Sequence, residues 1–276
     1  MNAVWIVALK EFRDGLRDRW IVAITVIFCL LAVGLAYFGA AASGVVGFTS
    51  LPATIISLAS LGVIIIPLIA LLLAYDAVVG EDENGTLLLL LTYPLARGQL
   101  LIGKFLGHGA ILATATLLGF GSAAVVIGLV SARTEWQAVA MAFSQFIFSA
   151  MLLGWVFVAF AYLISVFTSE KSRAAGLALL TWFGFVLVFD LLLLGILVVT
   201  EGQLHADILP YLLLLNPADV FRLTNLNGAN AGNAYGGILS IGQDTGFSVL
   251  TLLGVQLFWI IVPLLIAVQV FKRRKV

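Results

Sequence analysis

Residues 52–75 read PATIISLASLGVIIIPLIALLLAY and contain no charged side chain. A helix rises about 1.5 Å per residue and the hydrocarbon core of a bilayer is about 30 Å thick, so about 20 such residues cross it. Comparable apolar stretches occupy residues 20–42, 100–130, 136–167, 174–200 and 246–271. A transmembrane barrel would instead show short alternating strands. The sequence therefore predicts an all-α polytopic membrane protein, a single domain over residues 1–276 with six transmembrane helices.

Composition supports this class and excludes others. Of the 276 residues, 62% are hydrophobic and 10% are charged, which no soluble domain of this size sustains. The formal net charge is zero, so no basic field indicates nucleic acid as a partner. The single cysteine, Cys29, excludes an internal disulfide, and we find neither a His-Glu-x-x-His motif nor a Cys, Met and His cluster. We therefore expect no catalytic residues, no metal and no cofactor bound by this chain.

The basic residues predict the orientation. With six spans both termini share one side, and twelve of the fourteen Lys and Arg residues fall on that side. They are Lys10, Arg13, Arg17, Arg19, Arg97, Lys104, Lys171, Arg173, Lys272, Arg273, Arg274 and Lys275. Only Arg133 and Arg222 fall on the other side. By the positive-inside rule, the N- and C-termini are cytoplasmic in a multi-pass protein of the bacterial inner membrane, with the lipid bilayer as its solvent.

Residues 1–19 form an amphipathic pattern ahead of the first span. Apolar side chains recur every three or four residues, at Trp5, Leu9, Phe12 and Leu16. Charged side chains occupy the opposite face. The pattern predicts a helix lying in the headgroup boundary. The alternative is a solvated extension of the first span.

The predicted second cytoplasmic segment, residues 76–99, reads DAVVGEDENGTLLLLLTYPLARGQ and carries the densest charge in the chain. Three consecutive acidic residues, 81–83, precede the turn-prone pair Asn84 and Gly85. The apolar run 87–91 is too short to cross a membrane. We expect it to form a short helix along the cytoplasmic surface.

This segment carries a family resemblance. Glu83-Asn84-Gly85-Thr86 with the leucine run after it resembles the coupling-loop signature of ABC-2-type transporter permeases. The stretch KEFRDGLRDR at 10–19 resembles their N-terminal elbow helix, and Asn216-Pro217-Ala218-Asp219 resembles the Asn-Pro element before their last span. The three landmarks stand in the family's order and cover the whole chain.

The resemblance implies a type V exporter-like permease fold with an elbow helix and a cytoplasmic coupling helix. It also implies a second copy of the chain and a cytoplasmic ABC ATPase dimer that carries ATP and Mg. Within the family the chain most resembles permeases that serve maturation of the copper enzyme nitrous-oxide reductase in denitrifying bacteria. That likeness implies a periplasmic accessory protein. The absence of metal ligands argues against transport of copper itself, and a sulfur species or mechanical signalling is more compatible with the apolar path.

The coupling residues that this resemblance implies are Glu81, Asp82, Glu83, Asn84, Gly85, Thr86 and Arg97. We expect the carboxylates to pair with basic groups of the ATPase and the leucines to be buried against it. The alternative is an ordinary charged surface loop that stabilises the bundle.

Residues 98–104 match the spacing of a phosphate-binding loop, but Phe105 replaces the Ser or Thr that would bind magnesium, and no strand precedes the motif. The chain therefore needs a separate nucleotide-binding subunit. The pair Gly103 and Gly107 permits close helix packing.

Two candidate functional residues, Asp190 and His108, fall within predicted spans. Asp190 lies deep in the fifth, where an unpaired charge costs at least about 2.5 kcal/mol. We assign it to the translocation path or a dimer seam, with a hydrogen bond to a neighbouring helix as the alternative. His108 is assigned to the same path, with a satisfied interior histidine favoured.

We interpret residues 201–245 as a periplasmic loop that either closes the outer mouth of the helical bundle or binds an extracytoplasmic partner. Its candidate contacts are Asn216, Pro217, Asp219 and Arg222.

Two other functions remain open on the sequence. One is a secondary transporter or channel driven by an ion gradient, with Asp190 as its site. The other is a scaffold that anchors soluble enzymes without transport. Dependence on ATP hydrolysis by a partner separates the three.

Overall fold

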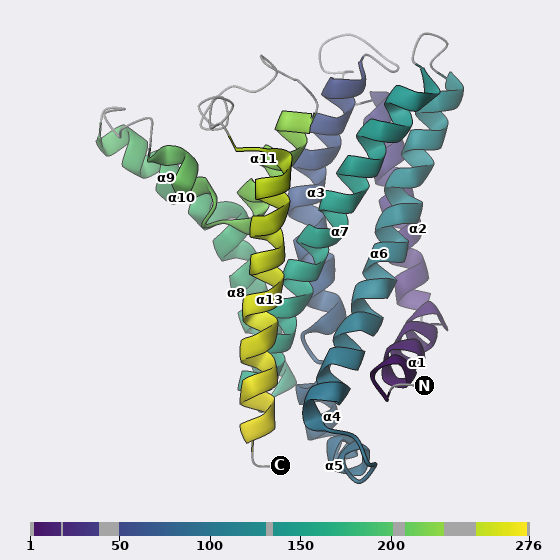
Figure 1. Cartoon of the computed structure of the whole chain (residues 1–276), viewed down its shortest axis with the longest axis vertical. Helices are drawn as coiled ribbons and strands as arrows, with labels where there is room; N and C mark the ends of the chain where they lie inside the picture. The colour runs from purple at the N-terminus through teal and green to yellow at the C-terminus, as the bar shows by residue number, and fades with distance from the viewer. Residues whose placement is uncertain are drawn as a thin grey trace.

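The computed structural model describes residues 3–17, 19–38, 50–130, 135–200, 208–228 and 247–274, and regular structure in these ranges is helical throughout (Figure 1). The longer helices are α1 (Ala3–Arg17), α2 (Arg19–Phe38), α3 (Leu51–Ala74), α6 (Arg97–Val130), α7 (Trp136–Phe167) and α13 (Val249–Arg273). The fifth span comprises α8 (Lys171–Phe183), a π-helical turn η2 (Gly184–Val188) and α9 (Phe189–Val199). Short helices are α4 (Val79–Glu83), α5 (Thr86–Leu91), α10 (Leu209–Leu213) and α11 (Pro217–Gly228).

The described helices agree with the predicted spans. Five helical segments are long and apolar enough to cross a membrane, and six if α1 and α2, bent by 71° at their junction, count as one span. The bounds of α7 coincide with the predicted range 136–167. The end of the first predicted span, residues 39–42, and most of the loop 201–245 lie outside the described residues.

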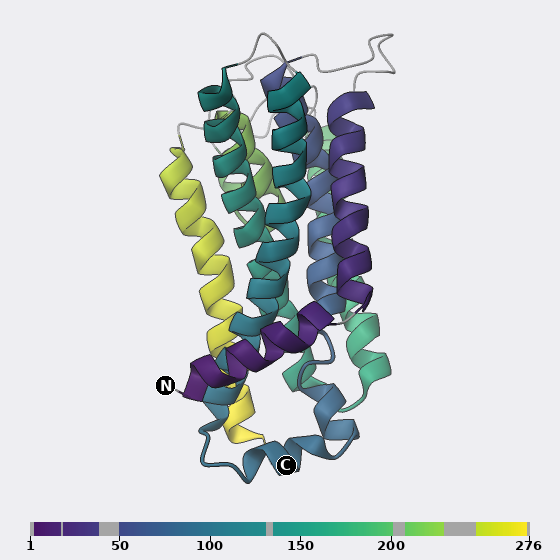
Figure 2. The ribbon, with the colours of Figure 1, turned by 90° about the vertical axis from the view of Figure 1, so that its right-hand side faces the viewer.

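The spans form a bundle with both termini at one end. In Figures 1 and 2, α2, α3, α6, α7 and α13 run along the long axis, while α1 crosses it near the end that also carries α4 and α5. We call this the α5 end and the other the α9 end. The fifth span starts with α8 against α3 and α7, and at the α9 end α9 diverges from the other spans (Figure 1).

Helix α7 is the centre of the core. It packs against α3, α6 and α13, and its aromatic side chains Phe146, Phe157 and Tyr162 are fully buried. The fifth span is the opposite case, because many of its apolar side chains are exposed, as in Leu180, Leu191 and Val198. Exposed leucine is the expected surface of a helix that faces hydrocarbon or another membrane helix.

Helix α1 packs tightly on α6 through the glycine pair. A Cβ atom on Gly103 would lie 2.7 Å from Val7 Cβ, and one on Gly107 would lie 2.5 Å from Glu11 Cβ. Both distances are shorter than real contacts, so only glycine lets the two backbones approach this closely. The predicted apolar stripe, including Trp5, is largely exposed on the other face of α1. Its contact with a membrane stays a prediction.

We predict that Gly107→Ala destabilises the protein by about 1–3 kcal/mol, because the added methyl group overpacks the α1–α6 contact. The matched control is Gly121→Ala on the same helix, where a Cβ meets no atom within 4 Å. That change should be neutral or stabilising by up to about 1 kcal/mol, since alanine favours helix. Unfolding of the detergent-solubilised protein measures both, and equal effects of the two changes would contradict the packing argument.

Candidate functional site

The segment between α3 and α6 folds into two short helices joined by a tight turn. Helix α4 ends at Glu83 with Asn84 as its C-cap, and Gly85 reverses the chain with φ of +69°, a left-handed conformation that glycine adopts without strain. The Thr86 hydroxyl donates to the carbonyl of Glu81 at 3.2 Å across this turn. Helix α5 covers the leucine run for which a short surface helix was predicted. We call residues 76–96 the docking loop.

A buried lysine joins the docking loop to α1 and α6. Lys104 Nζ lies 2.7 Å from Glu81 Oε1 and 3.0 Å from Glu11 Oε1, and its side chain is only 6% exposed. Burial by itself would raise the pKa of Glu11, but the Lys104 ammonium group holds that pKa below its ordinary value. Glu11 therefore contributes stability above its unfolded pKa that is lost as the pH falls through its folded pKa.

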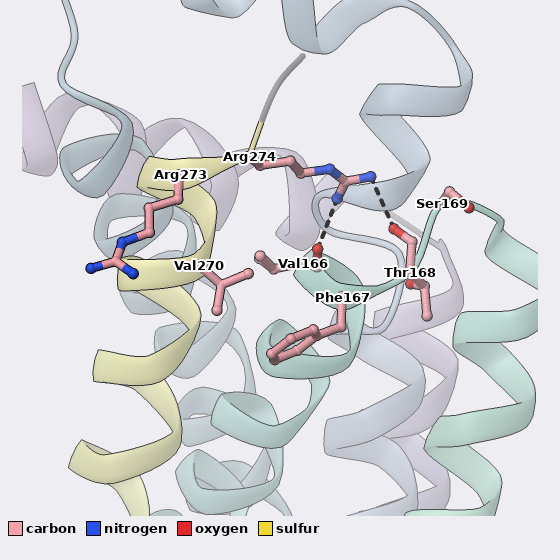
Figure 3. Close-up of a pocket in the computed structure, with 7 residues that line it drawn as sticks. All are labelled: Val166, Phe167, Thr168, Ser169, Val270, Arg273 and Arg274. Carbon is pink, nitrogen blue, oxygen red and sulfur yellow. Dashed lines mark hydrogen bonds between the residues drawn. The ribbon is translucent and has the colours of Figure 1, made fainter.

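An arginine at the end of α13 binds the next carboxylate. Arg274 Nη2 donates to Asp82 Oδ2 at 2.7 Å and to the carbonyl of Thr168 at 3.0 Å, while Nη1 donates to the carbonyl of Val166 at 3.0 Å. Figure 3 shows this side chain reaching across to the end of α7, beside a pocket of about 390 Å³. Arg97 donates to the carbonyl of Arg274, which adds the start of α6.

The third carboxylate binds the start of α8. Glu83 Oε1 accepts from the backbone N–H of Lys171 at 2.7 Å, where the first N–H groups of a helix lack partners. The Lys171 ammonium lies 3.4 Å from Asp76, and Ser165 Oγ on α7 accepts from the N–H groups of Val78 and Val79 at 3.0 Å each. The docking loop is thus bonded to Lys104 of α6, to the end of α7, to the start of α8 and to the residue after α13, and Lys104 links it in turn to Glu11 of α1.

The acidic residues of the docking loop have partners within the chain. Glu81, Asp82 and Glu83 were expected to pair with basic groups of an ATPase, with a loop that stabilises the bundle as the alternative, and the bonds seen here are of the second kind. Arg97, assigned to the same set, donates to carbonyls at the end of α13. Basic side chains at the α5 end pair with Glu81 and Asp82, whereas Glu83 accepts from a backbone N–H group. Contact of these residues with another subunit stays a prediction.

The outward surface of the docking loop is apolar. Leu87 is buried against the bundle, whereas Leu88, Leu89 and Tyr93 are 58%, 65% and 58% exposed. Asn84, Gly85 and Thr86 are exposed at the tip. A cluster of large apolar side chains on a charged and braced loop is typical of a surface that another protein covers.

A second polar site lies towards the α9 end. Arg222 Nη1 is 2.6 Å from Asp190 Oδ2 and 2.7 Å from Asp219 Oδ1. Asn216 Nδ2 donates to Asp219 Oδ2 and to the carbonyl of Phe185, both at 2.9 Å. Asp190 is therefore paired, as in the alternative interpretation of its role, and its place in a translocation path or dimer seam stays a prediction.

The Asn-Pro element holds α11 in place. Asn216 Oδ1 accepts from the N–H of Ala218 at 3.0 Å, and Pro217 occupies the first position of the helix, where its missing N–H is not needed. Asn225 Nδ2 donates to Ser149 Oγ on α7 at 3.0 Å. Asn216 and Asp219 are buried, so they could serve a periplasmic partner only through the helices that they position.

The fifth span is not the regular α-helix that we expected over residues 174–200. Residues Gly184–Val188 form a π-helical turn. The carbonyl of Phe185 lies in this turn and accepts from Asn216, so the irregular stretch meets the Asn-Pro element directly. π-Turns inside α-helices often mark functional positions.

His108 is a satisfied interior residue. Its Nδ1 lies 2.7 Å from the hydroxyl oxygen of Tyr162, which is fully buried. In the described part of the chain, no three His, Cys, Asp or Glu side chains come together in a way that could hold a metal ion.

Comparison with known proteins identifies the family. The sequence profile of the family described as "ABC-2 family transporter protein" matches residues 5–276. The chain belongs to the ABC-2 transporter family. A protein named "Probable ABC transporter permease protein NosY" from Stutzerimonas stutzeri is 58% identical over 274 residues, with 99% of each chain covered. A protein of the same name from Pseudomonas aeruginosa is 56% identical over 276 residues, with 100% of each covered.

Sequence reasoning missed the residues that brace the docking loop of this ABC-2 protein. Lys104, Ser165 and Arg274 were not assigned to the site, yet each bonds to the loop. Lys104 appeared only among the basic residues of the predicted cytoplasmic side and in the false phosphate-binding motif. Its one signal was a lysine at the start of an apolar span, where a buried cation requires nearby carboxylates.

We predict that Lys104→Met destabilises the protein by about 3 kcal/mol or more, because two carboxylates then lose their buried counter-ion. The control is Lys10→Met, which removes an exposed lysine from α1 and should cost no more than about 1 kcal/mol. Thermal unfolding in detergent compares the two. The triple variant Lys104→Met/Glu11→Gln/Glu81→Gln should regain part of the loss, and no recovery would argue against the charge explanation.

Proposed function

We propose that this chain is the membrane-spanning permease subunit of an ABC transporter, and that its docking loop binds separate cytoplasmic ATPase subunits. The observation that carries this proposal is the exposed face of Leu88, Leu89 and Tyr93 on a loop whose charges are bonded inward. Family membership supports it, because an ABC permease implies an ATPase partner.

Rigidity and burial both favour docking at α5. Each large apolar side chain that becomes fully buried contributes roughly 1.5–3 kcal/mol, so three anchors supply a substantial part of a specific interface. The internal ion pairs fix these anchors relative to the spans. An ATPase that displaces α5 therefore also displaces the ends of the spans to which the docking loop is bonded.

ATP and Mg belong to the partner in this proposal. The ammonium group of Lys104, the lysine of the false phosphate-binding motif, is already bonded to Glu81 and Glu11. Phe105 next to it has no hydroxyl to offer a metal ion. The chain itself is proposed to perform no covalent chemistry, and its cycle is alternating access or mechanical coupling.

We assign the α5 end to the cytoplasm. Of the basic side chains that the structure describes, only Arg222 lies towards the α9 end, and the other ten lie at the α5 end: Lys10, Arg13, Arg17, Arg97, Lys104, Lys171, Arg173, Lys272, Arg273 and Arg274. This distribution favours a bacterial inner-membrane protein with both termini inside.

A second copy of the chain completes the proposed permease. Asp190 and Arg222 have side chains that are 36% and 18% exposed on the least packed side of the bundle. An ion pair open to hydrocarbon is costly, so protein or water covers it in the assembled transporter. Such pairing also makes Asp190 a poorer cation site than the ion-gradient alternative requires.

The proposed biological role is maturation of nitrous-oxide reductase. It rests on the likeness to proteins named NosY permeases and on the sequence resemblance to permeases of that process. We further propose a periplasmic accessory protein at the α9 end, with transport of a sulfur species or mechanical signalling as the output.

The double variant Leu88→Glu/Leu89→Glu should abolish co-purification of the ATPase subunits from native membranes, because two charges replace the apolar anchors. The matched control is Leu215→Glu, an exposed leucine 56% accessible at the α9 end. It should leave co-purification unchanged. Retention of the ATPase by the double variant would refute docking at α5.

The orientation can be tested with single cysteines in a Cys29→Ser background. Asn84→Cys at the tip of the docking loop should react with a membrane-impermeant maleimide only in inside-out vesicles, since it faces the cytoplasm in our assignment. Tyr211→Cys, an exposed residue of α10, should react only in right-side-out spheroplasts. The reverse pattern would invert the topology.

A further inference from the structure

Arg274 occupies an unusual position between the end of one helix and three other segments. It is the residue directly after α13, and its side chain is only 16% exposed. Its guanidinium group binds a carboxylate of the docking loop and two carbonyls at the end of α7. Its own carbonyl, with that of Phe271, accepts from Arg97 at the start of α6.

Among the described residues, two polar links join the docking loop or its end to the sixth span: the Asp82–Arg274 ion pair, and the hydrogen bonds from Arg97, the residue after the loop, to the carbonyls of Phe271 and Arg274. The loop is covalently continuous with α3 and α6, whereas Asp82 and Arg274 are separated by 192 residues in sequence. The remaining carboxylates connect elsewhere: Glu81 reaches α1 and α6 through Lys104, and Glu83 reaches α8. Among the described residues, the Asp82–Arg274 ion pair is the salt bridge that joins the loop to α13.

We infer that Arg274 is the positioning residue that connects the docking loop to the sixth span, so that displacement of the loop moves α13 together with α3 and α6. This inference rests on the proposed function, because it assumes that an ATPase displaces the loop. Arg274 touches neither nucleotide nor substrate in this scheme. It acts through Asp82 and through the end of α7.

The chemistry of the position requires arginine. A planar guanidinium group presents several N–H donors in fixed directions, and here they serve a carboxylate and two carbonyls at once. A lysine ammonium is a point charge that can keep the Asp82 ion pair but does not reproduce the fork. The bond is also partly shielded from water, which strengthens a charge-assisted hydrogen bond relative to an exposed pair.

The neighbouring arginine offers a matched control. Arg273 carries the same charge one residue earlier, is exposed, and lines the same pocket. In Figure 3 its guanidinium group points away from Val166 and Thr168, on the other side of α13. Among the described residues it has neither a salt bridge nor a side-chain hydrogen bond. Removing its charge changes the local field without cutting the connection.

The experiment uses the complete complex with its ATPase subunits in nanodiscs, in the Cys29→Ser background. One reporter cysteine, the α5 reporter, is placed directly after α5 (Thr92→Cys) and, in a separate protein, one on α13 (Gln269→Cys); both positions are exposed. Labelling rates with a soluble maleimide are measured without nucleotide and after trapping with ATP and vanadate. In the otherwise unmodified complex both rates should change on trapping.

In Arg274→Gln, the α5 reporter should keep its nucleotide-dependent change and the α13 reporter should lose most of it, since only the Arg97 bonds to backbone carbonyls remain. Arg273→Gln should keep both changes, and Arg274→Lys should keep part of the α13 response. Asp82→Asn cuts the same bond from the loop side, so it should reproduce Arg274→Gln, and the double variant should be no worse than either single change. If Arg274→Gln does not assemble, Asp82→Asn with its paired reporters decides the question.

Different outcomes overturn the docking function and the role of Arg274. An α5 reporter that ignores nucleotide in the unmodified complex would overturn the proposed docking function. An intact α5 response together with an α13 response that persists in Arg274→Gln and Asp82→Asn would overturn the role of Arg274 alone. Equal loss of the α13 response in Arg273→Gln would also overturn it, since that result reflects general charge rather than this connection.

Discussion

The architecture at the α5 end depends on one buried ammonium group. Lys104 enters the membrane boundary on α6 with carboxylates from α1 and from the docking loop around it. A buried cation is costly unless it is paired, and neither carboxylate could lie there without the lysine. Three segments from separate parts of the chain are therefore fixed by one charge. The glycine pair beside it lets α1 approach closely enough for Glu11 to reach that charge.

Much of the fold follows from the sequence because the bilayer imposes strict limits. Apolar runs of the right length must be helices, since no water satisfies their backbone groups in hydrocarbon. That constraint located the spans, and for residues 136–167 the predicted and observed bounds coincide. The short leucine helix could be predicted equally well, because an apolar run too short to cross the bilayer must lie outside its hydrocarbon core. Gly103 and Gly107 indicated a close helix contact, though not that α1 was the partner.

The candidate site was harder to predict, because its bonds join residues that are distant in sequence. A run of acidic residues at 81–83 indicates an interaction but does not name the partner. Asp82 meets Arg274, and Glu83 meets the backbone of Lys171, only because the helix ends converge at one end of the bundle. Arg222 was counted as a loop charge on the far side, and its bond with Asp190 depends on how α11 packs beside the fifth span. Sequence periodicity does not indicate such contacts between residues that are distant in sequence.

The π-turn in the fifth span changes how that helix is numbered around its axis. A π-turn holds about one residue more than an α-turn, and each residue of an α-helix advances the direction of its side chain by about 100°. A regular helical wheel drawn from Lys171 to Val199 therefore loses its phase at Gly184–Val188. Such a wheel predicts the angle between the side chains of Leu180 and Leu191 around the helix axis. Because the π-turn lies between them, that predicted angle does not apply. Any mapping of this span by residue spacing has to be carried out separately on α8 and on α9.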